Sequence, residues 1–316
     1  MSIPISSIMG IDVGKSQLDA ALHEDSASHS FPNTPEGMVK FFAWIQDVSP
    51  ALVAVEATGG YEQALVHFLC KAGVNVAVVS PKRVLDFARS QNLRAKTDKL
   101  DAHNIAHFGA VMKPRLFVRP SPVQEKLEAL VTRRRQISWM LISEKNRLMQ
   151  ASLEIKPRIH EHIDWLEEEE KDIQGQMRDL IDSDKVMQEK MRILTSAQGI
   201  GDISAYTLLS EVPEMGIIGG KEVSALLGVA PYNRDSGKMK GKRHTKGGRY
   251  NARSAFYMAT LSSIRWNPVI KRFYERLLSQ GKEKKVAIVA CMRKFIVILN
   301  AMMRDRKPFL VQSSFT

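Results

Sequence analysis

The chain has 316 residues, of which 44% are hydrophobic, and its 46 lysines and arginines outnumber 34 aspartates and glutamates to give a net charge of +12. This length and apolar content are enough for two compact domains with cores of their own, and they exclude a disordered tail protein. The basic excess favours a polyanionic partner such as nucleic acid, although an anionic membrane surface would attract the same charge.

The sequence shows no signal for secretion or membrane insertion. No run of about 18 apolar residues that would span a bilayer stands out, and the N-terminal stretch MSIPISSIMG lacks the basic start of a signal peptide. We therefore expect a cytoplasmic protein that makes no membrane contact. Cys70 and Cys291 lie far apart without metal-ligand spacing. We interpret both as small core residues and expect neither a disulfide nor a zinc site.

The first third of the chain alternates strand and helix signals. We predict three strands first, in SIMGIDVG (7–14), QLDAALHE (17–24) and SHSFPN, with the second as the hairpin partner of the first. The pattern then predicts a helix at 35–47, a strand at 51–57, a helix at 61–72, a strand at 74–81, and helices at 82–90 and 98–112. This is the element order of an RNase H-like α/β domain, a mixed sheet covered by helices. Prolines at 114, 120 and 122 mark a linker after this domain of residues 1–118.

The middle of the chain, residues 119–190, changes to a helical period. Mostly apolar residues recur at roughly heptad spacing in two runs, which Pro157 separates. The first run is Leu127, Leu130, Arg134, Ile137, Leu141, Leu148 and Ala151. The second run is Ile159, Ile163, Leu166, Ile173, Met177 and Leu180. We interpret this segment as a helical hairpin with coiled-coil character that serves dimerisation or spacing. The alternative is a pair of helices that pack only on their own domain.

The last part, residues 191–316, is a separate, mainly helical domain. Its first stretch, ILTSAQGIGDISAYTLLSEV (193–212), predicts a helix, a tight turn through Gly199, Ile200 and Gly201, and a second helix. This is the helix-hairpin-helix pattern, in which turn amides and a helix N-terminus hold a phosphate. Gly199 and Gly201 are therefore candidate nucleic-acid contacts, but turn glycines also have a purely geometric explanation.

Four acids fall where such an α/β domain brings its elements together. Asp12 ends the first predicted strand and Glu56 a later one, while Asp98 and Asp101 are three residues apart on one helix face. Four carboxylates at one sheet edge repel each other and raise each other's pKa, and a divalent cation relieves the conflict. Oxygen ligands favour Mg²⁺, as one ion or as a pair about 3.5–4 Å apart.

The acids also have a plain interpretation, in which each is solvated or paired with a base such as Arg94 or Lys96. His103 and His107 lie four residues apart on the same predicted helix. Zinc sites need three or four ligands, and no third ligand of matching spacing is evident. We interpret the two histidines as structural.

Basic residues crowd the stretch VAPYNRDSGKMKGKRHTKGGRYNAR. They are opposed only by Asp235 and comprise Arg234, Lys238, Lys240, Lys242, Arg243, Lys246, Arg249 and Arg253. With glycines between them, we expect a flexible cationic loop that follows a phosphate backbone without identifying bases. Ser236, beside Gly237, is a candidate nucleophile. A serine hydroxyl needs a base, a cation or a metal to activate it; His244 is a candidate base, and a solvated loop serine is the alternative.

Several motifs together resemble one known family over nearly the whole chain. They are MGIDVGKSQLD, VEATGGYE, LRAKTDKLDAHNIA, GIGDISAYTLLSE and ALLGVAPYNRDSGKMKGKRHTKGGRYNARSAFYMA. These stretches resemble the bacterial transposases of the insertion-sequence-110 type, which include the Piv-like DNA invertases and the bridge-RNA-guided recombinases.

The resemblance implies a RuvC-like N-terminal domain with a four-acid Mg²⁺ site at Asp12, Glu56, Asp98 and Asp101. It also implies a C-terminal transposase domain in which Ser236, in DSGK, attacks DNA and forms a covalent phosphoserine intermediate. In the family the two sites meet across protomers of a dimer or tetramer, and a structured guide RNA pairs with donor and target DNA. Asp235 departs from this scheme, because its charge opposes a neighbouring phosphate.

Three other functions fit parts of the sequence. In a metal-only endonuclease, of the kind that resolves Holliday junctions, water attacks and Ser236 takes no part. A non-catalytic RNA-binding scaffold would account for the charge and the helical hairpin. GIDVGKS also resembles the first phosphate loop of sugar-kinase or actin-type ATPases, but that fold needs a duplicated second domain, whereas residues 123–190 are helical in pattern.

Overall fold

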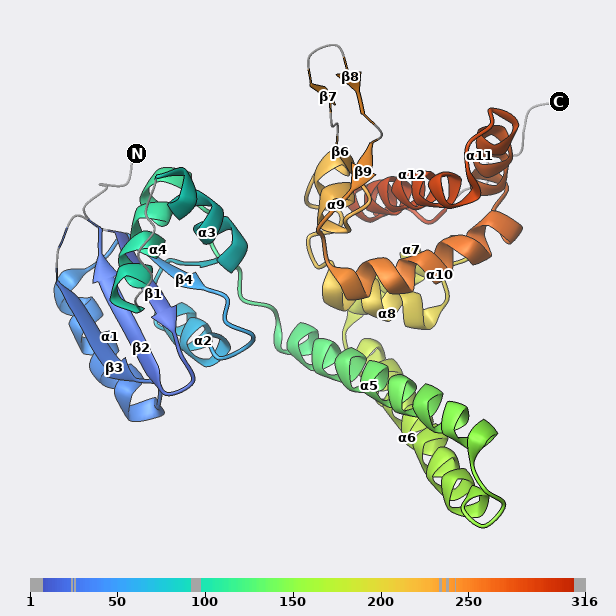
Figure 1. Cartoon of the computed structure of the whole chain (residues 1–316), viewed down its shortest axis with the longest axis horizontal. Coiled ribbons are helices and arrows are strands. Elements are labelled where there is room, and N and C mark those ends of the chain that lie inside the picture. The colour runs from blue at the N-terminus through green and yellow to red at the C-terminus, as the bar shows by residue number, and fades with distance from the viewer. Residues whose placement is uncertain are drawn as a thin grey trace. The chain divides into compact units, whose positions relative to one another are not determined.

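The computed structural model describes residues 8–23, 25, 27–91, 98–232, 235–236, 239–241 and 243–309, with only the backbone described for 98–100, 235–236 and 239–240. The chain forms two compact units, one ending at Arg119 and the other beginning at Pro120 (Figure 1). The helical hairpin that follows the linker belongs to the second unit.

The first unit contains a five-stranded mixed sheet in the order β3-β2-β1-β4-β5. Antiparallel pairing joins β1, β2 and β3, and parallel pairing joins β1, β4 and β5. The strands are β1 (Ile8–Val13), β2 (Gln17–Leu22), β3 (Ser28–Pro32), β4 (Leu52–Glu56) and β5 (Val76–Val79). All five predicted strands are confirmed, and the mixed sheet is compatible with an RNase H-like domain.

Helices cover both faces of this sheet: α1 (Pro35–Val48), α2 (Gln63–Lys71), α3 (Pro81–Ser90) and α4 (Asp98–Met112). Met9 and Ile11 of β1 share a core with Phe41 of α1 and Leu65 of α2. Alternate strand residues point to opposite faces, so Gly10 and Ala54 face the other side, where α3 and α4 pack. The four predicted helices are confirmed, and the termini of each lie within two residues of the predicted ones.

Helix α4 lies directly on the backbone of β1. A Cβ atom at Gly10 would come within 2.2 Å of both the Ala102 carbonyl oxygen and the Ala106 amide nitrogen. Farther along the helix, a Cβ at Gly109 would meet Ile8 and Ala54 at 3.1 and 3.2 Å. The helix therefore runs antiparallel to β1, and its first turn lies at the carboxyl end of that strand.

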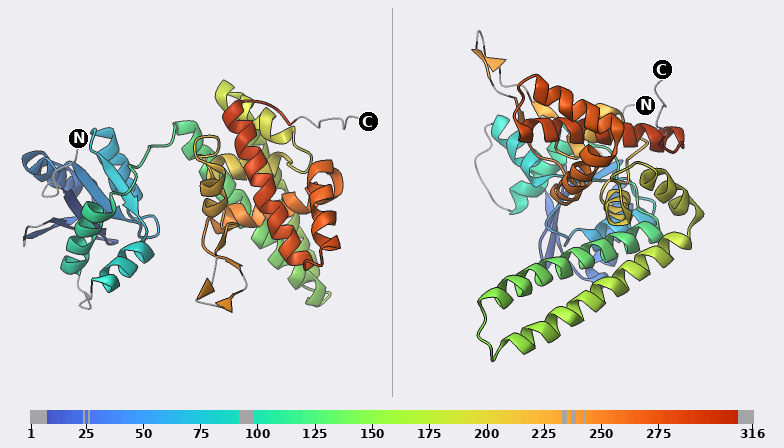
Figure 2. Two further views of the ribbon diagram at one scale, coloured as in Figure 1. Left: turned by 90° about the horizontal axis from the view of Figure 1, so that it is seen from above. Right: turned by 90° about the vertical axis from the view of Figure 1, so that its right-hand side faces the viewer.

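The second unit begins with the predicted helical hairpin, α5 (Pro122–Gln150) and α6 (Lys156–Asp182), which lie side by side (Figures 1 and 2). Pro157 stands in the first turn of α6 and so begins that helix. Apolar residues fill the seam: Leu127, Val131, Ile137 and Leu141 from α5, with Ile163, Leu166, Ile173 and Met177 from α6. Two ion pairs cross it, Arg134–Glu170 at 3.1 Å and Lys145–Glu167 at 2.7 Å.

The remaining helices pack around the base of this hairpin. They are α7 (Lys185–Thr195), α8 (Asp202–Glu211), α9 (Gly220–Leu226), α10 (Tyr250–Trp266), α11 (Pro268–Ser279) and α12 (Lys284–Asp305). One apolar cluster extends from Leu127 on α5 to Met302 on α12. Gln124 also donates its side-chain amide to the Leu209 carbonyl at 2.6 Å, which fixes α5 to the end of α8. The hairpin base and the C-terminal helices therefore share a core.

Helix α12 corrects one expectation. It is long and apolar enough to cross a membrane by composition, with a mean hydropathy of 1.9 over its most apolar window, whereas no such run was expected. In the fold its apolar residues serve the core, where Cys291, Phe295 and Leu299 are fully buried. Burial raises the pKa of the Cys291 thiol to about 11. Cys291 is thus a core residue as predicted, and Cys70 is half-buried.

The basic stretch forms a short β-ribbon where the sequence suggested an irregular loop. Its strands are β6 (Pro231–Tyr232), β7 (Asp235–Ser236), β8 (Met239–Lys240) and β9 (His244–Thr245), with β6 paired to β9 and β7 to β8. The β7–β8 end projects away from the helices of the second unit (Figures 1 and 2). The ribbon therefore presents Ser236 outside the helical core.

The contact between α4 and β1 predicts a strong effect of Gly10→Ala. The added methyl group meets helix backbone on both sides, so α4 must move away, at a cost of about 1–3 kcal/mol or more. Hydrogen exchange in the full-length protein should become faster in peptides from β1 and α4. Gly175→Ala is the control, because it lies on α6 with open space around it and should stabilise its helix by about 0.5–1 kcal/mol. Unchanged exchange in Gly10→Ala would contradict the packing described.

Candidate active site

The strand register brings two of the predicted acids to one edge of the sheet. β1 and β4 are parallel neighbours with Ile11 opposite Val55, so Asp12 and Glu56, one residue further on each strand, stand at adjacent carboxyl ends. Both lie on the α4 side of the sheet, because strand residues alternate between faces and Gly10 meets α4. Both residues are half-buried.

Helix α4 brings the other two acids to the same edge. Its first residue is Asp98, and Asp101 immediately precedes Ala102, whose carbonyl lies against Gly10. Asp101 is half-buried, while the side chain of Asp98 lies outside the described residues. Among the side chains that the structure describes, no group of three or more acids, histidines or cysteines is close enough together to hold a metal ion. The backbone thus gathers the acids, and the four-acid metal site itself stays a prediction.

The structure adds an acid that the sequence analysis missed. Asp19 of β2 pairs in register with Asp12 across the antiparallel ladder, so both side chains leave the sheet on the same face. Asp19 is only 6% exposed and accepts hydrogen bonds from the Gln17 amide at 2.8 Å and the Ser30 hydroxyl at 2.5 Å. Like charges directly opposite are unfavourable, which strengthens the case for a cation here. Once the hairpin was predicted, its register was the signal that would have identified Asp19.

His107 has a contact within the unit. Its Nδ1 atom lies 2.9 Å from Nε2 of His23, and the two rings stack with centroids 5.2 Å apart. Phe87 of α3 also packs against His107, with ring centroids 5.1 Å apart. These contacts join α4 to β2 and α3, consistent with the structural role inferred for His107.

The ribbon determines the surroundings of Ser236. In its backbone, Ser236 lies opposite Met239 and Asp235 opposite Lys240. The side chains of Ser236 and Lys240, and all of Arg234, Lys238 and Lys242, lie outside the described residues. Arg243 and Lys246 are exposed, as a contact to a phosphate backbone requires.

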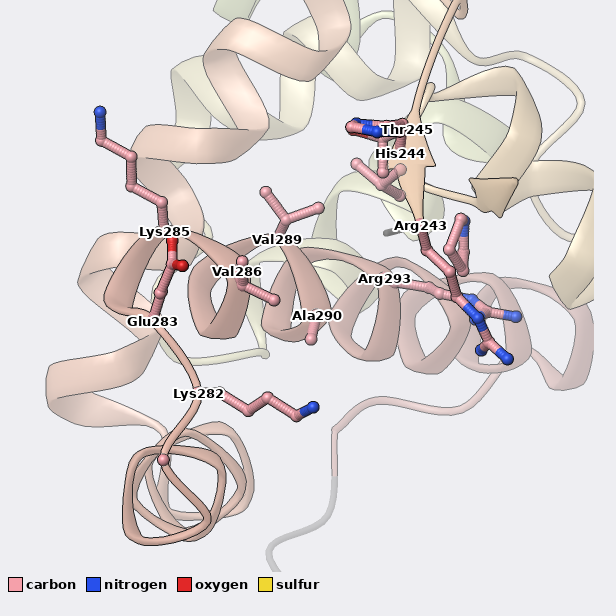
Figure 3. Close-up of a pocket in the computed structure, with 13 residues that line it drawn as sticks. Arg243, His244, Thr245, Lys282, Glu283, Lys285, Val286, Val289, Ala290 and Arg293 are labelled. Carbon is pink, nitrogen blue, oxygen red and sulfur yellow. The ribbon is translucent and has the colours of Figure 1, made fainter. Parts of the chain in front are cut away.

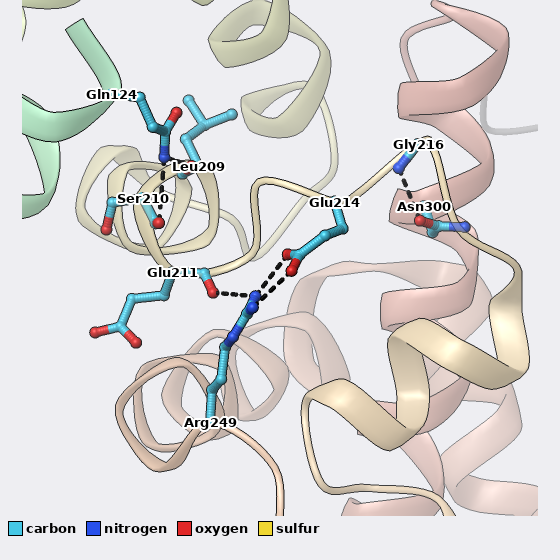
Figure 4. Close-up of polar contacts among 8 residues, drawn as sticks. All are labelled: Gln124, Leu209, Ser210, Glu211, Glu214, Gly216, Arg249 and Asn300. Carbon is cyan, nitrogen blue, oxygen red and sulfur yellow. Dashed lines mark hydrogen bonds and ion pairs between the residues drawn. The ribbon is translucent and has the colours of Figure 1, made fainter. Parts of the chain in front are cut away.

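Arg249 has an intramolecular partner (Figure 4). Its guanidinium donates two hydrogen bonds of 2.6 Å to the Glu214 carboxylate and one of 2.7 Å to the Glu211 carbonyl. A paired fork of this kind ties the start of α10 to the segment after α8. These hydrogen bonds engage three of its five N–H groups and favour a structural role for Arg249, while its binding of nucleic acid stays a prediction. Arg253 donates to the Gly247 carbonyl at 2.5 Å and is half-buried, so it is only partly available.

The glycine turn also has a packing explanation. Gly199 adopts a φ of 102°, and a Cβ there would lie 2.1 Å from the Ser263 hydroxyl of α10. Gly201 caps α8 and faces open space. The next residue, Asp202, places a carboxylate in the first turn, which opposes an anion at that helix end. This geometry favours the structural interpretation of Gly199 and weakens the phosphate-binding interpretation of the turn.

Family models match both units of the chain. The DEDD-type model described as "Transposase" matches residues 9–157, and the model described as "Transposase IS116/IS110/IS902 family" matches residues 191–275. Pilin gene-inverting proteins of Moraxella lacunata and Moraxella bovis are each 30% identical over 311 residues, which cover 95% of this chain and 97% of the relative. The chain belongs to the IS110 transposase family.

A third relative matches only part of the chain. An uncharacterized 42 kDa protein of the insertion element IS900 from Mycobacterium paratuberculosis is 31% identical over 134 residues, covering 39% of this chain and 33% of the relative. Membership of this transposase family supports enzymatic rearrangement of DNA and therefore DNA binding. The DEDD-type match covers the acidic edge, and its four-acid type is consistent with use of a divalent metal.

Asp19 is expected to contribute to cation binding at the acidic edge. Asp19→Asn keeps the size of the side chain but removes the charge opposite Asp12, and should weaken Mn²⁺ binding by about tenfold, the lower end of the effect of outer ligand-supporting groups. Isothermal titration of the full-length protein measures this. Asp47→Asn, an exposed acid on α1, is the control and should bind as the wild type does. Equal Mn²⁺ affinity in both variants would remove Asp19 from the site.

We expect a substitution of Arg249 to lower stability and a substitution of Lys246 to weaken DNA binding. Arg249→Gln removes a partly exposed ion pair with two parallel hydrogen bonds. The free energy of unfolding should fall by about 1–2 kcal/mol, which lowers the unfolding temperature by about 2–8 °C. Lys246→Gln should leave that temperature unchanged and reduce the slope of log Kd for DNA against log salt by about one. Thermal unfolding and fluorescence anisotropy distinguish the two. A reduced salt slope in Arg249→Gln with unchanged stability would restore its role in binding.

Proposed function

We propose that this transposase-family chain is a divalent-metal-dependent recombinase that cuts and rejoins DNA through a covalent intermediate on Ser236. The observation that carries the proposal is the placement of acids on three elements, β1, β4 and the first turn of α4, at one sheet edge. A second support is the basic ribbon that carries Ser236 outside the helical core within the other matched segment.

The acidic edge fits a hard divalent cation, which we propose to be Mg²⁺. Its donors are carboxylates, and Asp12, Glu56 and Asp101 are half-buried, where neighbouring like charges repel each other more strongly than in water. Asp12, Glu56, Asp98 and Asp101 would hold the cation, with Asp19 adding charge behind Asp12. When bound, the cation supplies polarisation of the scissile phosphate and stabilises the negative charge that develops there.

Ser236 would act as the nucleophile. Its Oγ atom forms a bond to the scissile phosphorus as the bond to the 3′ oxygen breaks, the serine proton is lost, and the 3′ oxygen leaves as a hydroxyl. The phosphoserine ester keeps the energy of the broken bond, so a new 3′ hydroxyl can attack it and reseal the strand. Arg243 and Lys246 would help to neutralise the pentavalent transition state.

The proposal also includes the assembly of protomers and the binding of a guide RNA. Trp139, Ile142 and Trp165 on the helical hairpin are each more than half exposed. Exposed apolar residues of this size are typical of interaction surfaces, which supports dimerisation through the hairpin. We propose a dimer or tetramer in the cytoplasm in which the acidic edge of one protomer serves Ser236 of another. Its partners would be donor and target DNA and, by resemblance to the family, a structured guide RNA.

A denaturing gel tests the covalent step. Labelled DNA that carries one end of the insertion element should form a protein–DNA adduct in the presence of Mg²⁺. The adduct should be lost in Ser236→Ala and in Asp12→Asn. Ser279→Ala, on α11, is the matched serine control and should keep the adduct. A free 5′ phosphate without an adduct would indicate a metal-only endonuclease. Tight RNA binding without any strand cleavage would indicate a scaffold.

Sequencing the nucleic acid that co-purifies with the protein tests guidance separately. One abundant, short, structured RNA is the expected result. Its absence from a preparation that still forms the adduct would favour an invertase-like enzyme that acts on DNA without RNA.

A further inference from the structure

A basic cleft lies between the base of the ribbon and α12. Its volume is about 710 Å³, and one wall comes from β9 and the residue before it, while the other comes from the start of α12 (Figure 3). The basic lining residues are Arg243, Lys282, Lys285 and Arg293, with His244 beside them and Glu283 as the single acid of the lining. Of the two walls, α12 lies outside both segments that the family models match.

The cations of this cleft are available to a ligand. Arg243, Lys282, Lys285 and Arg293 are all exposed, and none has an ion pair or a side-chain hydrogen bond with the part of the chain that the structure describes. The contrast with their neighbours is clear. Arg249 is paired with Glu214, and Lys294 lies 4.5 Å from the centre of the Phe273 ring. The cleft thus gathers four cations that make no ion pair or side-chain hydrogen bond within the described part of the chain.

The spacing of these charges fits a polyanion. Lys285 and Arg293 are eight residues apart on α12, which separates them by about 12 Å along the helix. One strand of B-form DNA places three or four phosphates over that length, at about 3.4 Å each. Between the two cations, Val286 and Ala290 form an apolar floor (Figure 3). Short side chains there leave room for sugars between the cations at either end, which could each contact a phosphate.

We infer that this cleft binds the sugar–phosphate backbone of the DNA strand that enters the serine ribbon. The inference rests on the proposed function for the identity of the strand. The cleft is continuous with the ribbon that carries Ser236, because Arg243 and His244 belong to that ribbon. Figure 3 places Arg243 and Arg293 at the same end of the cleft. This arrangement favours DNA over an acidic protein as the ligand. A strand held at the ribbon base is led toward the projecting β7–β8 end.

The test compares two double variants in a Ser236→Ala background with chelator present, so that no chemistry occurs. Lys285→Gln/Arg293→Gln removes two cleft charges. Lys271→Gln/Lys284→Gln removes two exposed charges that do not line the cleft, one on α11 and one at the start of α12. The probes are a 30-base-pair DNA duplex, a DNA single strand and an RNA of the same sequence, and anisotropy is measured at several salt concentrations.

The cleft variant should bind DNA about tenfold more weakly, with the slope of log Kd against log salt reduced by about two. The control should change by less than about twofold, and both should keep the unfolding temperature. Equal losses in the two variants would overturn the proposal, and so would a loss confined to RNA. Because binding is measured without cleavage, a failure to form the serine adduct would sink the proposed function and leave this result standing.

Discussion

The direct contact between α4 and β1 is the constraint on which the acidic edge depends. Because Gly10 has no side chain, the backbone of α4 approaches β1 closely enough that a Cβ there would lie 2.2 Å from helix atoms. This contact fixes both the height and the direction of the helix, and so places Asp101 beside the end of the strand that carries Asp12. A chain with a larger residue at position 10 would carry the same acids without the same convergence.

In the second unit, the positive charge is divided between two roles. Arg249, Arg134 and Lys145 form ion pairs that join separate segments of this unit, so these cations contribute to the packing of the fold. Arg243, Lys282, Lys285 and Arg293, the exposed cations of the cleft, have no such partner among the described residues. The net charge therefore overstates the number of cations that can bind nucleic acid. The pattern of ion pairs shows which cations remain available to a polyanion.

The carboxylates of the sheet edge lie in the first compact unit, and the serine of the basic ribbon lies in the second. The mechanism that we propose needs both sets of groups, and assembly of protomers would bring them together. In that proposal, the long helical hairpin, which carries the exposed side chains of Trp139 and Trp165, would bring protomers together.

The sequence by itself determined the strands and helices of the first unit and the hairpin, because periodicity and element order are local properties, and it predicted a four-acid site that stays a prediction. It did not reveal Asp19, whose importance comes from its cross-strand register with Asp12. It could not distinguish the role of Arg249 from that of Arg243, since both are basic residues in one run. The partner of Arg249, Glu214, is distant in the sequence. Only the tertiary structure decided which charges are consumed in packing, because that depends on contacts between distant segments.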